Sequence, residues 1–205
     1  MLAFLHTSPT HIQRFTTLVR KYNPSIEIVH FVNEELLETV MKTGRIDLKG
    51  FEGLIKSIQE KHPKLIICTC STYGEACNNY TNVKRIDLPI AHYIVEHFSR
   101  IILAYTAVST QYVSKRLIED VAKTKRKKIE IILCDCSTAW DYFLLNEMEN
   151  YYKEIFRKVN EINKKGSVIF LTQASMEGAK KYFENMDVEV FSSGEFGVMK
   201  YLEEL

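Results

Sequence analysis

The chain has 205 residues, of which 46% are hydrophobic and 26% are charged. This length suits one large domain or two small ones, and the composition excludes intrinsic disorder. Lys and Arg number 27 and Asp and Glu number 26, so the formal net charge is +1. Charge therefore gives no reason to expect nucleic acid or an anionic membrane as a partner.

The sequence shows no signal peptide and no run of about eighteen apolar residues, so we expect a cytoplasmic protein that does not enter a membrane. In that compartment the five cysteines are expected to be free thiols. No glycine-rich phosphate loop or dinucleotide fingerprint is present, and we expect no cofactor.

Short β-rich runs alternate with longer amphipathic stretches along the chain. The predicted strands are residues 2–6, 27–31, 65–70, 84–87, 101–105, 129–133, 167–172 and 188–191. The predicted helices are residues 9–21, 51–61, 91–100, 109–123, 148–163 and 175–185, with a looser helix over 33–47. Because several strands are almost wholly apolar, they fit the interior of a parallel sheet covered by helices. The alternation predicts an α/β fold.

The two halves of the chain resemble each other at an offset of about 100 residues. Thr7 matches Thr106, and the tract from Cys70 (CSTYG) matches the tract from Ala174 (ASMEG). We predict two pseudo-symmetric lobes, residues 1–98 and 99–205, each with a mostly parallel four-stranded sheet and with a cleft between them. A final helix is expected to pack back on the first lobe. The alternative to an internal repeat is that the two halves share only the similarity that any two strand–helix units have.

Ligands of open parallel sheets bind beyond the carboxyl ends of the strands. Those ends carry hydroxyl-rich turns just before predicted helices, where free N–H groups suit a carboxylate or a phosphate. The candidate binding residues are Thr7, Ser8, Ser71, Thr72, Thr106 and Ser175. The sequence therefore predicts a small anionic ligand, held by hydroxyls and backbone amides in the cleft.

Cys70 ends a buried strand and opens one of these turns. A helix N-terminus lowers the pKa of a thiol and favours the thiolate, which acts as a general base or as a nucleophile. Cys70 is therefore the predicted catalytic residue. The alternative is a small buried residue with a structural role.

The tracts Thr7-Ser8-Pro9, LIICTCSTYG (65–74) and VIFLTQASMEG (168–178) resemble the aspartate/glutamate racemase superfamily, which also contains hydantoin racemases, maleate isomerases and arylmalonate decarboxylases. The resemblance covers nearly the whole chain. It implies two α/β lobes with the active site in the cleft, a small carboxylate-bearing substrate and no cofactor, and it is compatible with a homodimer. Racemases of this group use two cysteines, one per lobe, on opposite faces of the substrate.

One of those two cysteines has no counterpart in this alignment. Cys70 matches the first, with Ser71 and Thr72 at carboxylate-holding positions, whereas Ala174 stands at the second-acid position. Since a methyl group carries no exchangeable proton, the resemblance disfavours two-base racemisation. It predicts isomerisation, decarboxylation or lyase chemistry with a single thiol. The alternative is a non-catalytic relative that binds a small anion.

The remaining cysteines have mostly structural interpretations. Cys136, which follows a strand expected at a sheet edge, is the candidate for a replacement acid, and Cys68 and Cys77 are expected to be structural. Two Cys-x-Cys pairs, 68/70 and 134/136, suit zinc in principle. Because they lie in different lobes without a supporting Cys-x-x-Cys or His pair, we predict no metal site.

Other side chains are assigned mainly to structure. His6 ends the first strand, either as an acid or orienting group of the site or as a packed residue. Asp87 is predicted to cap the helix at residue 91, and the basic run 123–128 to form a solvated helix end. The aromatic residues within 140–143 are predicted to pack in the core, and Glu195 to open a final helix.

Overall fold

The computed structural model describes all residues, 1–205. The chain divides into two compact units: unit 1 is Met1–Asp87 together with Gly194–Leu205, and unit 2 is Leu88–Ser193. Helix α5 (Leu88–His97) groups with unit 2, whereas the predicted boundary at residue 98 placed it in the first lobe. The physical reason is its packing on helix α6 and the contact of Tyr93 with Phe191, both within unit 2.

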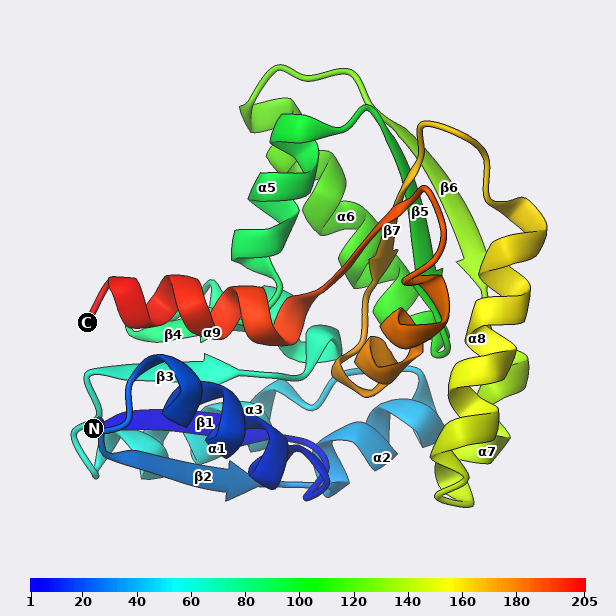
Figure 1. The fold of residues 1–205 in the computed structure, drawn as a ribbon. Helices are drawn as coiled ribbons and strands as arrows, with labels where there is room; N and C mark the ends of the chain where they lie inside the picture. Colours follow the sequence, from blue (N-terminus) through cyan, green and yellow to red (C-terminus); the bar gives the residue numbers. More distant parts are fainter. The chain divides into compact units, whose positions relative to one another are not determined.

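Unit 1 holds a four-stranded parallel sheet in the order β2-β1-β3-β4 (Figure 1). Its strands are β1 (Leu2–His6), β2 (Ile28–Val32), β3 (Leu65–Cys68) and β4 (Val83–Arg85). Its helices are α1 (His11–Tyr22), α2 (Glu35–Thr43), α3 (Leu48–Gln59), the 3₁₀ turn η1 (Ser71–Tyr73), α4 (Gly74–Cys77) and α9 (Ser193–Glu203). The short η1 and α4 replace the longer helix that usually comes after a buried strand.

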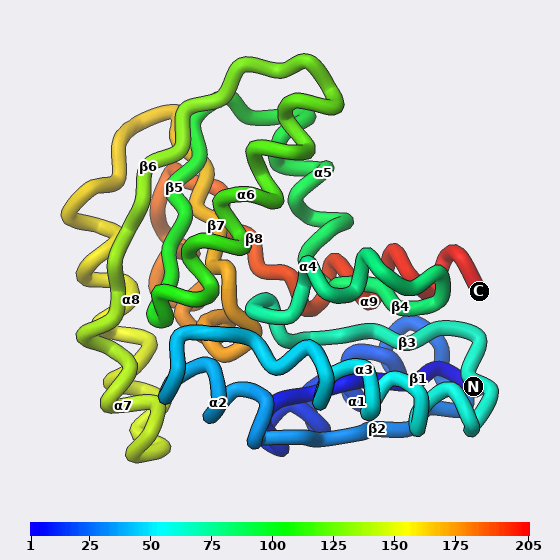
Figure 2. The backbone as a smooth tube through the Cα atoms, turned by 180° about the vertical axis from the view of Figure 1, so that it is seen from behind, coloured from blue at the N-terminus to red at the C-terminus, as the bar shows by residue number.

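Unit 2 repeats this topology with a parallel sheet in the order β6-β5-β7-β8 (Figure 2). Its strands are β5 (Arg100–Tyr105), β6 (Glu130–Asp135), β7 (Val168–Leu171) and β8 (Glu189–Ser192). Besides α5, its helices are α6 (Val108–Thr124), the 3₁₀ turn η2 (Ser137–Ala139), α7 (Trp140–Leu144), α8 (Met148–Ile162) and the 3₁₀ helix η3 (Ala174–Phe183). The predicted α/β class is confirmed, and β6, the strand before Cys136, lies at a sheet edge as expected.

The central strands explain why the sequence folds this way. All residues of β1, β3 and β7 are buried, as their unbroken apolar runs predicted. The helices α1, α3 and α8 place one apolar face against these sheets, with Phe15, Ile55 and Ile155 fully buried. Burial on both faces stabilises each sheet and fixes the carboxyl ends of its strands, where the candidate residues lie.

Helix α9 completes unit 1. Val198 and Tyr201 are buried, and the Tyr201 hydroxyl donates a hydrogen bond to the carbonyl of Arg85 at 2.8 Å. At the other end of the helix, Glu195 accepts hydrogen bonds from Lys21 Nζ at 2.6 Å and from the Tyr22 hydroxyl at 2.7 Å. The predicted opening of a final helix near Glu195 is confirmed.

Asp87 has a role that the sequence pattern does not reveal. Its carboxylate is fully buried and accepts two hydrogen bonds from the Arg85 guanidinium, at 2.6 and 3.0 Å. Burying two charges is tolerated because they pair in this bidentate way. Asp87 therefore primarily holds Arg85 beneath the turn that carries Cys70, and no capping bond to α5 is seen.

The predicted aromatic core cluster at 140–143 is wrong in part. Helix α7 has no buried residue, and Tyr142 and Leu144 are 37% and 66% exposed. Trp140 stacks on Phe143 at a centroid distance of 4.9 Å, and only Phe143 packs against the core of unit 2. A helix this short turns few of its side chains inward. Across the whole chain, no helix has both the length and the apolar character that crossing a membrane requires.

Candidate active site

Cys70 lies two residues after β3 and is the N-cap of η1, with extended backbone dihedrals of −89° and 108°. Thr69 extends the sheet by one bond, because its N–H donates to the Leu5 carbonyl at 3.0 Å. The chain then turns sharply, and the Tyr73 N–H bonds back to the Cys70 carbonyl at 3.1 Å. Cys70 is partly exposed, whereas Ser71 and Thr72 are buried. The turn thus presents one thiol at the carboxyl end of a central strand.

The surroundings of the Cys70 sulfur favour the protonated thiol. Burial, and after it the neighbouring Cys68, raises the pKa of the Cys70 thiol to about 11. The Thr7 hydroxyl and the N–H groups of Tyr73 and Thr72 act in the opposite direction and lower this pKa. The predicted lowering of this pKa is therefore wrong. The expected dipole is weak because η1 and α4 have only three and four residues.

The hydroxyl side chains of unit 1 are divided between two settings. Thr7, directly after β1, is buried and bonds the Cys70 sulfur, and Thr72 contributes its N–H to the same atom. Ser8 lies further out and shares a 2.9 Å hydrogen bond with the hydroxyl of Thr10. The structure therefore brings Thr7 and Thr72 to the thiol, while Ser8 belongs to the start of the β1–α1 loop.

A chain of hydrogen bonds lies behind this site, and of its members the sequence pattern singles out only His6. The Thr69 hydroxyl donates to the Leu5 carbonyl at 3.2 Å, so it accepts from His6 Nδ1 at 2.8 Å. The other His6 nitrogen, Nε2, then accepts from Nδ1 of His30 at 2.8 Å. His30 Nε2 in turn accepts from the Thr16 hydroxyl at 2.9 Å. His6 is fully buried and both of its ring nitrogens are hydrogen-bonded within unit 1, which favours the packed alternative over an acid of the site.

This arrangement requires neutral imidazoles, because each ring uses one nitrogen as an acceptor. Burial is the main cause that lowers the pKa of His6 to about 3 and that of His11 to about 4, and it also lowers the pKa of His30. His30 pairs with Phe4 across β1 and β2. The sequence signal for the role of His30 is therefore a polar residue on the inner face of a predicted strand.

Unit 2 places a different residue at the position of Cys70. The Thr172 N–H and hydroxyl both bond the Ala104 carbonyl, at 3.1 and 2.9 Å, as Thr69 bonds Leu5 in unit 1. Thr172 is thus the counterpart of Thr69, and the next residue, Gln173, is the counterpart of Cys70. The predicted match of Cys70 with Ala174 is one residue out of register, because it was aligned on Gly74 and Gly178 and not on the strands.

The Gln173 side chain closes the turn after β5. Its amide oxygen accepts hydrogen bonds from the N–H of Thr106 at 2.7 Å, the Thr106 hydroxyl at 2.9 Å and the Ala107 N–H at 3.3 Å. Beside it, the Tyr151 hydroxyl lies 2.9 Å from Ser175 Oγ and 3.3 Å from Thr106 Oγ1. Thr106 and Ser175 therefore belong to one buried network of unit 2, in which burial raises the pKa of Tyr151 to about 12.

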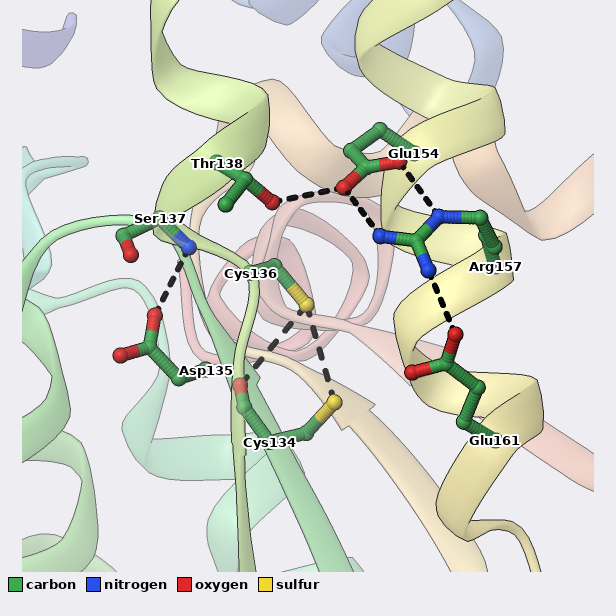
Figure 3. Close-up of polar contacts among 8 residues, drawn as sticks. All are labelled: Cys134, Asp135, Cys136, Ser137, Thr138, Glu154, Arg157 and Glu161. Carbon is green, nitrogen blue, oxygen red and sulfur yellow. Dashed lines mark hydrogen bonds and ion pairs between the residues drawn. The ribbon is translucent and has the colours of Figure 1, made fainter.

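Cys136, the candidate replacement acid, lies at a different strand end. Its N–H bonds the Tyr105 carbonyl at 2.8 Å, as the Asn33 N–H bonds the His6 carbonyl in unit 1, so it comes directly after the edge strand β6. Its sulfur lies 3.7 Å from that of Cys134, and both residues are buried. Figure 3 shows the two side chains pointing toward each other. The Cys134 contact raises the pKa of Cys136 far above its usual range.

The polar side chains around this thiol pair are engaged with one another. Glu154 accepts hydrogen bonds from Arg157 and Thr138, which lower its pKa to about 2, and Arg157 also binds Glu161 (Figure 3). No group of three or more His, Cys, Asp or Glu side chains in the chain is arranged to hold a metal ion. This region therefore has the character of an ion-paired helix face over a buried thiol pair.

Solved structures similar to this chain are racemases. An aspartate racemase from Picrophilus torridus superposes with a TM-score of 0.76 at 13% identity, over 99% of this chain and 93% of the other. A glutamate racemase from Bacillus anthracis gives a TM-score of 0.72 at 12% identity, over 100% and 81%. An allantoin racemase from Klebsiella pneumoniae gives 0.64 at 15% identity, over 100% and 86%.

No protein-family model and no curated protein sequence matches the chain. At identities this low the structural likeness establishes the fold: the chain has the α/β fold of the aspartate, glutamate and allantoin racemases. This agrees with the superfamily that the strand-end tracts of the sequence resemble.

Proposed function

We propose that the chain is a cofactor-independent isomerase that removes and returns a proton at the carbon next to a substrate carboxylate. Cys70 is the proton-transferring group. The observation that carries this proposal is the position of Cys70, a partly exposed thiol at the carboxyl end of the central strand β3, where the Thr7 hydroxyl and the N–H groups of Tyr73 and Thr72 act to lower its pKa. The racemase fold supports the reaction class.

Each residue of the turn has a role in this proposal. The hydrogen bonds from Thr7, Thr72 and Tyr73 stabilise the thiolate that forms when Cys70 gives up its proton. The hydroxyls of Ser71 and Thr72 donate hydrogen bonds to the substrate carboxylate. These hydrogen bonds become stronger as negative charge develops on the carboxylate in the enediolate-like state. The Thr69–His6–His30 chain keeps the strand ends in place and takes no proton itself.

Solvent-deuterium incorporation at the α-carbon tests this function. The wild-type protein is incubated in D₂O with aspartate, glutamate, their N-carbamoyl derivatives and other small carboxylates, and the exchange is followed by NMR. We expect Cys70-dependent exchange for at least one of these compounds. Cys70→Ser is expected to lower the rate by about a hundredfold or more, because a hydroxyl is a much weaker acid than a thiol.

Cys77→Ala is the matched control, since Cys77 is a buried thiol of the same unit that lies outside the turn. Its exchange rate should stay close to that of the wild type. Exchange that survives intact in Cys70→Ser, or its absence from every compound with both proteins folded, contradicts the proposed function.

A further inference from the structure

Gln173 stands in the same backbone setting as Cys70. Both residues have extended dihedrals and precede a 3₁₀ turn, and in both the carbonyl accepts a hydrogen bond from the residue three positions on. These bonds are 3.0 Å from Met176 to Gln173 and 3.1 Å from Tyr73 to Cys70. The two units thus offer a thiol and an amide at equivalent strand ends.

The orientation of the Gln173 amide is fixed by its neighbours. Two of the three groups around one end of the amide are backbone N–H groups, of Thr106 and Ala107, and these only donate. That end is therefore the oxygen. The amide nitrogen forms no hydrogen bond within the chain, and Gln173 is partly exposed. The side chain thus anchors its acceptor and leaves its two N–H donors available.

We propose that Gln173 is a ligand-binding residue of unit 2, which donates a hydrogen bond from Nε2 to a carboxylate or carbonyl oxygen and supplies no proton. The inference goes beyond the proposed function and stands independently of it. A carboxamide neither releases nor accepts a proton in the accessible pH range, but its N–H stabilises negative charge on an oxygen.

Gln173→Glu separates the two functions of the side chain. One carboxylate oxygen accepts the same three hydrogen bonds at the start of α6, where negative charge is favoured, so the melting temperature should stay the same or rise. The second oxygen replaces the free donor by an acceptor. Succinate, used as the probe, should bind at least tenfold more weakly by calorimetry.

Gln173→Met is the structural control, because it removes the anchor as well as the donor and should lower the melting temperature. A purely structural role for Gln173 predicts that the affinity for succinate is unchanged in Gln173→Glu. That result, or no succinate binding by the folded wild-type protein, overturns the proposal.

Absence of α-carbon exchange, with succinate binding still sensitive to Gln173→Glu, contradicts the proposed function alone.

Discussion

At the scale of single residues, the central finding is a thiol that is held in place but not ionised. Desolvation outweighs three hydrogen bonds at Cys70 and raises its pKa to about 11. Reactive thiols of other proteins reach the thiolate through a long helix or a neighbouring cation. Cys70 has neither, so it would meet its ligand as an acid and would act as a base only after losing a proton.

Alkylation of Cys70 by iodoacetamide should therefore be slow at neutral pH. The rate should rise about tenfold per pH unit and level off near pH 11, because the thiolate is the nucleophile. Peptide mass spectrometry after timed quenching separates Cys70 from the four buried thiols. A plateau below about pH 9 would show that the thiol is activated in the free protein.

The buried histidines make unit 1 sensitive to acid. In the unfolded chain these groups take up protons near pH 6.5, whereas the folded state holds His6 neutral down to about pH 3. The stability contributed by neutral His6 is therefore complete above pH 6.5 and is lost progressively as the pH falls toward 3. The loss approaches about 1.4 kcal/mol per pH unit for this residue.

Urea unfolding at pH 7, 6 and 5 measures this loss. His6→Asn, which keeps a hydrogen-bonding side chain but does not titrate, should be less stable than the wild type at pH 7 and show a flatter dependence on pH. Equal slopes for the two proteins would assign the acid sensitivity to other groups, of which His11 and His30 are the nearest.

At the scale of elements, the strands could be predicted because each is a short apolar run that a two-sided parallel sheet demands. The turns after the strands could not be predicted in the same way. The local similarity of CSTYG and ASMEG aligned Cys70 with Ala174, and only the backbone bonds of Thr69 and Thr172 show that Gln173 is the true counterpart. The hydrogen bonds of His30 and the burial of Asp87 depend on contacts between distant segments, which carry no periodic signal.

The turn after β3 also depends on a glycine. A Cβ at Gly74 would lie 2.6 Å from Cζ and from one terminal nitrogen of the Arg85 guanidinium, which Asp87 holds in place. Gly74→Ala should therefore destabilise the protein by about 1–3 kcal/mol through overpacking. Urea unfolding, which adds no competing guanidinium, gives the value.

Gly53→Ala is the matched control in helix α3, where a Cβ meets nothing within 4 Å. This substitution should stabilise the protein by about 0.5–1 kcal/mol, because alanine has the higher helix propensity. Equal effects of the two substitutions would mean that Arg85 moves aside freely.

At the scale of the whole molecule, unit 1 is assembled from two separate segments, and α9 brings the second one back. Its anchoring bonds end on Arg85, Lys21 and Tyr22, all in unit 1. Because these bonds lie within unit 1, they stabilise unit 1 more than unit 2.

Removal of residues 194–205 should speed amide hydrogen exchange in unit 1 and leave α6, α8 and the strands of unit 2 protected. Tyr201→Phe, which deletes one buried hydrogen bond, should cost about 1 kcal/mol and shift exchange in the same direction. Uniform acceleration over both units would show that they unfold together.

The split of unit 1 also sets an order of events on the ribosome. Residues 88–193 are all made before the helix that bonds Arg85 and contacts Ile86. Every residue of unit 2 therefore precedes the segment that completes unit 1. A chain that terminates before residue 194 has all residues of the amide site but lacks the helix that bonds Arg85, the residue beneath the thiol-bearing turn.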